Sequence, residues 1–184
     1  MPATRRVLAI ALVVGVAVST YVALHTATTL FNGGRPAWTE TAWPSTVDQW
    51  GRGIAFRCTA AACGSEIDLY LRAKFGFCGC ASTIGDEEVD RIADFDLVGA
   101  DYAALDAGHP IVMHGMEGRS RRYATSGSGA NRRSAIAVAL HDRCDMVVAT
   151  AVTTGGDLSA HEDAVIEFLN TPKIRRWTEV MLGL

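Results

Sequence analysis

The stretch Ser65–Cys80, SEIDLYLRAKFGFCGC, alternates between apolar and polar side chains from residue 67 onward. The apolar set is Ile67, Leu69, Leu71, Ala73 and Phe75, and the polar or amphipathic set is Asp68, Tyr70, Arg72 and Lys74. Alternation of this kind places the two sets on opposite faces of a β-strand. The sequence therefore predicts an extended strand over residues 65–75, with one face on a core and the other near water.

Further strands are predicted on both sides of this one. Residues 53–58 predict an antiparallel partner, reached through a turn at Thr59–Gly64. Later strands are expected over residues 111–116, 119–125, 134–140 and 145–153, the first two joined by a turn at Glu117–Gly118.

Three helices are predicted outside the N-terminal region. One opens at Asp86, whose first turn is rich in carboxylates that suit the helix dipole. A second follows the capping box Ser159–Glu162, and a third starts at Thr171–Pro172. With about six strands in consecutive hairpins, the pattern favours an α+β fold, a mostly antiparallel sheet covered by helices.

Length and charge limit the classes of function. The chain has 184 residues and a net charge of −3, so it carries no overall bias toward nucleic acid or anionic membrane. The patterns of a P-loop, a nucleophile elbow and a zinc-protease helix are missing from the sequence. An enzymatic role is therefore not favoured.

The N-terminus predicts a membrane anchor. Residues 7–24 are 18 consecutive residues without a charge, about 27 Å of helix, and extension to Phe31 completes a span. Arg5 and Arg6 precede the span, which favours a cytoplasmic N-terminus. The expected parts are a cytoplasmic segment (1–6), a transmembrane signal anchor (7–31), a linker (32–37) and an exported domain (38–184). A cleavable signal peptide is the alternative.

This topology places the chain in the bacterial inner membrane as a single-pass protein with its C-terminal domain in the periplasm. The expected partners are the membrane itself and an envelope protein, with no nucleic acid.

Two other clusters allow a structural or a binding interpretation. Trp38, Trp43 and Trp50 fit an irregular lead-in that covers the edge of the core, or a contact to lipid headgroups or a ligand. Five arginines lie around a Ser/Gly loop, and they fit a solvated hairpin edge or a contact to anionic headgroups or an acidic partner. They are Arg119, Arg121, Arg122, Arg132 and Arg133.

The five cysteines are expected to form disulfides outside the cytoplasm. Cys58 and Cys63 flank a short turn that they can bridge. Cys78 and Cys80 can pair with each other, or one of them can pair with Cys144. A single four-thiolate zinc site is disfavoured, because a strand over residues 65–75 holds the two pairs about 33 Å apart.

Cys78 and Cys80 also allow a redox pair or a soft-metal site for copper or zinc. His141 lies close to Cys144 in the sequence, which agrees with such a site. Calcium binding at Asp86, Glu87, Glu88 and Asp90 is a further possibility, although an exposed helix start explains these carboxylates better.

A set of short motifs resembles a family of uncharacterised exported bacterial proteins. They are Arg57-Cys58, Cys63-Gly64, LYLRAKFGFCGC, Arg143-Cys144-Asp145, EFLN and RWTEVMLGL, behind a signal anchor. The resemblance implies no activity. The hairpin-rich sheet that ends in a helix also loosely resembles the PsbP-like sandwich.

The sequence therefore favours a non-enzymatic, membrane-anchored periplasmic domain, stabilised by disulfides, that binds a partner or assists an envelope complex. The alternative is a periplasmic thiol redox or copper/zinc-binding protein that uses Cys78 and Cys80. An enzyme such as a hydrolase is a third and more distant possibility.

Overall fold

The computed structural model of this chain describes residues 37–44, 49–76, 83–98, 101–125, 133–153 and 158–184. The chain divides into two units, Met1–Arg35 and Pro36–Leu184, and all described residues belong to the second. The expected anchor over residues 7–31 lies outside the described residues, as do Cys78 and Cys80. Among the helices that the structure does describe, none combines the length and the apolar character that a membrane crossing requires.

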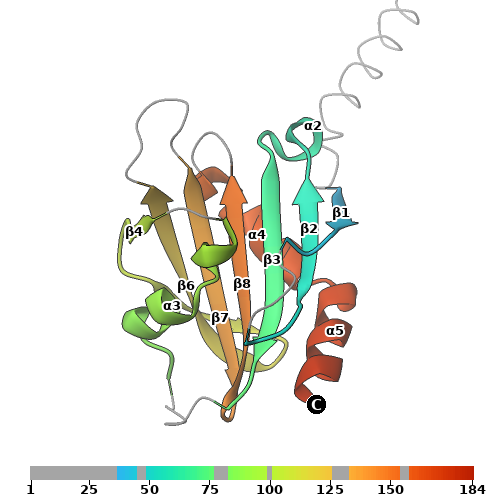
Figure 1. Cartoon of the computed structure of the whole chain (residues 1–184), viewed down its shortest axis with the longest axis vertical. Coiled ribbons are helices and arrows are strands. Elements are labelled where there is room, and N and C mark those ends of the chain that lie inside the picture. The colour runs from blue at the N-terminus through green and yellow to red at the C-terminus, as the bar shows by residue number, and fades with distance from the viewer. Residues whose placement is uncertain (1–36, 45–48, 77–82, 99–100, 126–132, 154–157) are drawn as a thin grey trace, which may run out of the picture. The chain divides into compact units, whose positions relative to one another are not determined.

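The described residues form an eight-stranded sheet in which every neighbouring pair is antiparallel (Figure 1). The order is β1 (Trp38–Thr41), β2 (Ile54–Cys58), β3 (Ile67–Lys74), β8 (Asp145–Thr153), β7 (Ser134–Asp142), β6 (Met116–Thr125) and β4 (Tyr102–Ala104). β5 (His109–Met113) also pairs with β6, beside β4. The prediction of a mostly antiparallel α+β fold is confirmed.

Strand β3 has the extended form that its alternation predicts. It lies between β2 and β8, with Leu69 opposite Phe56 on one side and opposite Ala151 on the other. Its apolar residues Ile67 and Leu69 are fully buried. The expected antiparallel pairing of residues 53–58 with this strand is also confirmed.

Helices lie on both sides of the sheet (Figure 1). On one side, the short helix η3 (Leu158–His161) leads into α4 (Glu162–Leu169), which is followed by α5 (Pro172–Leu182). On the other side lie α3 (Asp86–Ile92) and η1 (Phe95–Val98). A further short helix, α2 (Ala60–Cys63), joins β2 to β3.

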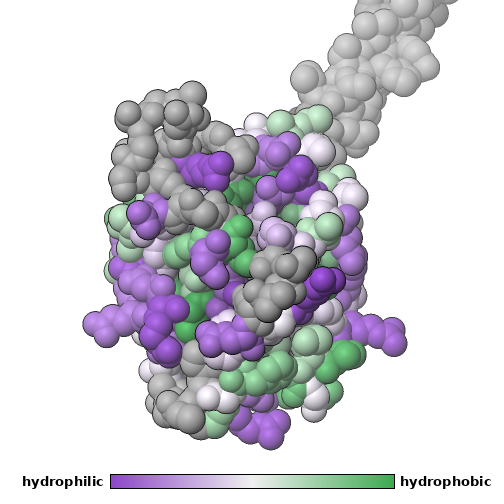
Figure 2. Space-filling view, viewed as in Figure 1, coloured by the Kyte–Doolittle hydropathy of each residue, from purple (hydrophilic) through white to green (hydrophobic). Residues whose placement is uncertain are grey.

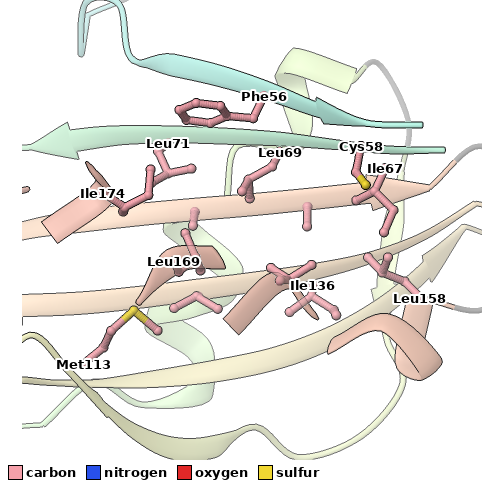
Figure 3. Close-up of a cluster of buried hydrophobic side chains, with 14 of the residues drawn as sticks. Phe56, Cys58, Ile67, Leu69, Leu71, Met113, Ile136, Leu158, Leu169 and Ile174 are labelled. Atoms are coloured by element: carbon pink, nitrogen blue, oxygen red, sulfur yellow. The ribbon is translucent and has the colours of Figure 1, made fainter. Parts of the chain in front are cut away.

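The larger core lies between the sheet and the C-terminal helices. Phe56, Leu69 and Leu71 from β2 and β3 pack with Leu169 of α4 and Ile174 of α5 (Figure 3). A smaller core on the opposite face joins α3 to the small side chains of β7. Its buried members include Val89, Ile92, Tyr123, Ala135, Ala137 and Ala139. The sheet therefore has two covered faces of different composition.

The hairpin between β5 and β6 turns earlier than predicted. His114 and Gly115 have φ values of 56° and 80°, and β6 already begins at Met116. Gly118 is extended and pairs with Leu140 of β7. A Cβ atom at Gly118 would lie 2.2 Å from the carbonyl oxygen of Ala139, so this glycine permits close strand approach and not a turn.

Helix α4 begins later than the capping box Ser159–Glu162 predicts. Residues 158–161 form η3, and α4 begins at Glu162 with no side-chain hydrogen bond at its N-cap, His161. The Glu162 carboxylate accepts a hydrogen bond from Ser120 Oγ of β6 at 2.9 Å instead. The start of α5 at Pro172 after the N-cap Thr171 agrees with the sequence.

Candidate functional site

The polar face of β3 is covered, contrary to the expectation that it lies near water. Only 2% of Arg72 and 4% of Lys74 remain exposed, and the half-buried Tyr70 lies on the same face. Alternation along a strand separates two faces but does not show whether a distant segment covers the polar one. Here that cover comes from the residues that follow α3 and from two tryptophans.

Arg72 and Lys74 share one carboxylate, that of Asp94. The Nε atom of Arg72 donates to Asp94 Oδ2 at 2.9 Å, and its Nη2 atom donates to Oδ1. The Lys74 ammonium lies 2.6 Å from Asp94 Oδ1 and donates to the Ile92 carbonyl oxygen at 2.7 Å. Because Asp94 is fully buried and the two cations are nearly so, these three residues form a buried charged cluster, called here the Arg72–Lys74–Asp94 cluster.

The carboxylate of Asp94 is positioned by α3 and by β8. The helix ends at Ile92, and the backbone N–H of Asp94 donates to Thr150 Oγ1 at 3.1 Å. Asp86, Asp90 and Asp94 are spaced four residues apart in the sequence. Asp86 and Asp90 lie within α3 and therefore share one face of the helix, whereas Asp94 follows the helix. All three carboxylates contact cations of the sheet.

Asp86 and Asp90 bind two arginines of β6. Asp86 pairs with Arg119, and Asp90 accepts from Arg121 Nη1 at 2.8 and 2.9 Å. Asp90 also accepts from the hydroxyl of Tyr123 at 2.8 Å. These contacts attach α3 to the sheet and occupy two of the carboxylates considered for calcium.

The arginines of β6 therefore do not form a solvated edge. Arg122 pairs with Asp106, as Arg119 and Arg121 pair with the aspartates of α3. The interpretation as an edge is wrong because β6 is an interior strand, with β7 on one side and β4 and β5 on the other. Arg132 lies outside the described residues.

Two of the three tryptophans lie over the cluster. Trp43 has its ring centroid 5.7 Å from the Arg72 guanidinium carbon, and Trp50 has its centroid 5.5 Å from the Lys74 ammonium. Both distances are within the range of cation–π attraction. Trp38 differs from the predicted irregular lead-in, because it belongs to β1 and stacks on Phe168 of α4 with centroids 4.7 Å apart.

Burial shifts the pKa values of Lys74 and Tyr123. Desolvation lowers the pKa of Lys74, and the carboxylate of Asp94 opposes this effect by favouring the ammonium form. Desolvation also raises the pKa of Tyr123, with a further rise from its hydrogen bond to Asp90. The tyrosine is therefore a neutral donor throughout the physiological range.

A pocket of about 460 Å³ opens beside the cluster. It is called here the Trp50 pocket, and its lining residues are Gln49, Trp50, Arg72, Lys74, Asp90, Arg91, Ala93, Asp94, Phe95 and Asp96. Figure 2 shows the side of the domain on which α3 lies, where hydrophilic residues are interspersed with small hydrophobic areas. A pocket with an aromatic wall, charged groups and a buried lysine is suited to holding a small polar ligand.

The described cysteines are in disulfides. Cys58 and Cys63 are bonded to each other, with Cα atoms 6.0 Å apart, as their flanking of a short turn predicts. Cys144, at the turn between β7 and β8, is also disulfide-bonded. Cys78 and Cys80, the predicted metal or redox pair, lie outside the described residues. Across the described ranges, no three metal-ligating side chains gather at one point.

Sequence reasoning missed the role of Arg72 and Lys74. The signal that was present is the pair of cations two residues apart on one face of an otherwise well-packed strand. Nothing in the alternation links them to Asp94, which is 22 residues away from Arg72 in the sequence.

No protein-family model and no curated protein sequence matches this chain. The solved structures that are similar in fold include two proteins from bacteria. The Pseudomonas aeruginosa protein of unknown function PA94 is 17% identical, with 73% of this chain and 94% of that chain covered and a TM-score of 0.48. Cyanobacterial PsbP from Synechocystis sp. PCC 6803 is 14% identical, with 74% and 78% covered and a TM-score of 0.43. The loose PsbP-like resemblance thus reappears in the structures, and likeness at this level carries no inference about function.

Proposed function

We propose that this chain is a single-pass protein of the bacterial inner membrane, and that its periplasmic domain binds a ligand or partner at the Trp50 pocket as an accessory domain of an envelope complex. The location rests on the uncharged span at residues 7–24 and the arginines before it. The binding role rests on the buried charges of the pocket.

The observation that carries the binding role is the Arg72–Lys74–Asp94 cluster. Its two cations are at most 4% exposed, and the desolvation of buried ions can exceed the gain from pairing them. Well-packed apolar residues at such positions are often equally or more stabilising. Buried charges with a perturbed lysine pKa beside a pocket therefore favour a role in binding over a role in stability alone.

The binding role is tested by capture of partners from solubilised membranes with the full-length chain as bait. The variant Asp96→Arg places a positive charge at the pocket wall, and Asp163→Arg makes the same change at an exposed position of α4 on the other side of the sheet. We expect Asp96→Arg to lose a partner that the wild type and Asp163→Arg retain. Recovery of no partner by the wild type, or equal recovery by both variants, would contradict the proposal.

The membrane location is tested separately, by fractionation and by intact mass. We expect the full-length chain in the membrane pellet after carbonate extraction, with its N-terminal residues retained, and a C-terminal alkaline phosphatase fusion that is active. A mature protein in the soluble periplasmic fraction, shortened at its N-terminus, would indicate a cleaved signal peptide instead.

A second candidate function, thiol redox chemistry, is favoured by the disulfide of Cys144. The end of β3 lies beside the turn that carries this residue, because the backbone N–H of Gly76 donates to Asp145 Oδ1 at 3.1 Å. Since Cys58 and Cys63 are bonded to each other, we propose that Cys144 bonds to Cys78 or Cys80. The remaining thiol can then exchange with this disulfide.

Alkylation and mass spectrometry of the exported protein, with and without reductant, test this second function. Thiol exchange predicts one free thiol, shared between Cys78 and Cys80. Copper or zinc binding at this pair instead requires both thiols to be unoxidised and a metal in the purified protein. Complete oxidation of both in every preparation, with no bound metal, would exclude both roles.

A further inference from the structure

We infer that the Trp50 pocket takes a neutral ligand rich in hydroxyl groups, a saccharide. This inference rests on the proposed function only in that the pocket is a binding site. It is carried by the charge balance of the lining and by the hydrogen-bonding groups that the fold leaves available there.

The charges of the lining residues are balanced. The cations Arg72, Lys74 and Arg91 face the anions Asp90, Asp94 and Asp96. A ligand with a net charge would therefore enter a lining of no net charge, and its own charge would lose hydration without full compensation. A neutral ligand avoids this cost.

Both donors and acceptors remain for a ligand. The side chains of Gln49 and Asp96 form no hydrogen bond or ion pair with any residue that the structure describes, and both residues are exposed. The Lys74 ammonium has three N–H donors, of which Asp94 and the Ile92 carbonyl take two. A hydroxyl group both donates and accepts hydrogen bonds. The hydroxyl groups of one sugar ring can therefore donate to the Asp96 carboxylate and accept from the Lys74 ammonium.

The position of Asp94 disfavours a carboxylate or phosphate ligand. Its Oδ1 atom already lies 2.6 Å from Lys74 Nζ, so a second anion on the same ammonium would lie close to this buried carboxylate and repel it. A neutral oxygen at that place carries no such penalty. The same reasoning disfavours the carboxylate end of a free amino acid.

Size and the aromatic wall agree with a sugar of one or two rings. The volume of about 460 Å³ is within the range of small-ligand sites. The indole of Trp50 provides an apolar surface for the C–H groups of a sugar ring.

Titration of the ¹⁵N-labelled chain by NMR tests the inference, with N,N′-diacetylchitobiose and maltose as saccharide probes and acetate and glycine as carboxylate probes. We expect saturable shifts of the Trp50 indole N–H with at least one saccharide, and weaker or no binding of acetate and glycine. Asp96→Asn should weaken saccharide binding about tenfold, because it replaces a charged acceptor. Asp163→Asn, the matched change on the far side of the sheet, should leave binding unchanged.

Three results would overturn the inference: no saccharide binds, a carboxylate probe binds more tightly, or the two asparagine variants bind the saccharide equally. If no saccharide binds while the membrane capture recovers a partner that Asp96→Arg loses, the inference fails and the proposed function stands. Lys74→Met provides a second variant, with its fold checked by circular dichroism, and it should also weaken saccharide binding.

Discussion

The two faces of the sheet are covered by different chemistry. Toward α4 and α5, the sheet presents Phe56, Leu69 and Leu71, which pack against apolar helix residues. Toward α3, it has only the smaller apolar core and also presents Arg72 and Lys74, which meet a carboxylate. The energy of apolar contacts depends little on the direction in which the side chains approach each other. Buried ion pairs require a defined geometry, and a buried charge that lacks its partner is strongly destabilising. The first face therefore supplies most of the stability, and the second fixes how α3 is placed.

Strand β3 contributes side chains to both faces of the sheet, so the apolar face and the charged face meet within one strand. Its residues Ile67, Leu69 and Leu71 are buried in the apolar core. Arg72 and Lys74 are almost as deeply buried, but they depend on partners from a segment about 20 residues away. Substitutions on the two faces should therefore differ in size and in their dependence on pH.

The largest effect is expected for Asp94→Ala, which leaves two buried cations without their carboxylate. Loss of one partner from a buried ion pair costs about 3–5 kcal/mol of unfolding free energy. Urea denaturation of the purified domain measures this cost. The triple replacement Arg72→Met, Lys74→Met and Asp94→Leu serves as the control and should recover most of the loss. A cost below about 1 kcal/mol for Asp94→Ala would show that water replaces the carboxylate.

Leu69→Ala on the other face should cost about 3 kcal/mol, because it leaves a cavity in a fully buried site. This cost should be constant between pH 5 and pH 8, since the residue neither titrates nor contacts a charge in the apolar core. A cost that changes with pH would indicate that the two faces are coupled.

Replacement of Cys58 and Cys63 by alanine should cost about 2 kcal/mol, because their bond closes a short loop in the unfolded chain. The comparison is made by urea denaturation without reductant. The wild type in the presence of reductant is not an adequate control, because Cys144 is also disulfide-bonded. An unchanged midpoint would show that α2 is held by packing alone.

The smallest effect is expected for Asp86→Asn, and it should depend on pH. A hydrogen bond from Arg119 is the main cause that lowers the pKa of Asp86 in the folded state. A lowered folded pKa gives stability that is present above the unfolded value and is lost as pH falls through the folded value. The difference between wild type and variant should thus be visible at pH 7 and should vanish in strong acid. Thermal denaturation across this range measures it, and a difference independent of pH would contradict the account.

Elements whose evidence is local could be predicted from the sequence. The alternation around Leu69 identified β3, and the residues of β7 and β8 alternate in the same way. The carboxylates at Asp86 correctly marked the start of α3. In each case the deciding pattern lies within one short stretch, so no knowledge of distant residues was needed.

Features that depend on distant contacts could not be predicted. Gly118 looked like a turn residue, but the closeness of β7 explains it, while His114 adopts the left-handed conformation at the actual turn. Glu162 looked like half of a capping box, but it binds Ser120 of β6. The candidate site was missed for the same reason, because Asp94 and Arg72 are 22 residues apart in the sequence and meet only through the tertiary fold.

The two-sided burial of β3 also protects the chain against error during folding. A slip of one residue relative to β2 and β8 would turn Arg72 and Lys74 into the apolar core and bring Leu69 and Leu71 to the carboxylate of Asp94. Each slipped arrangement would thus bury cations without a carboxylate and leave the carboxylate of Asp94 without a cation. Misaligned pairings should therefore be short-lived, and the correct alignment should be selected as the central strands assemble.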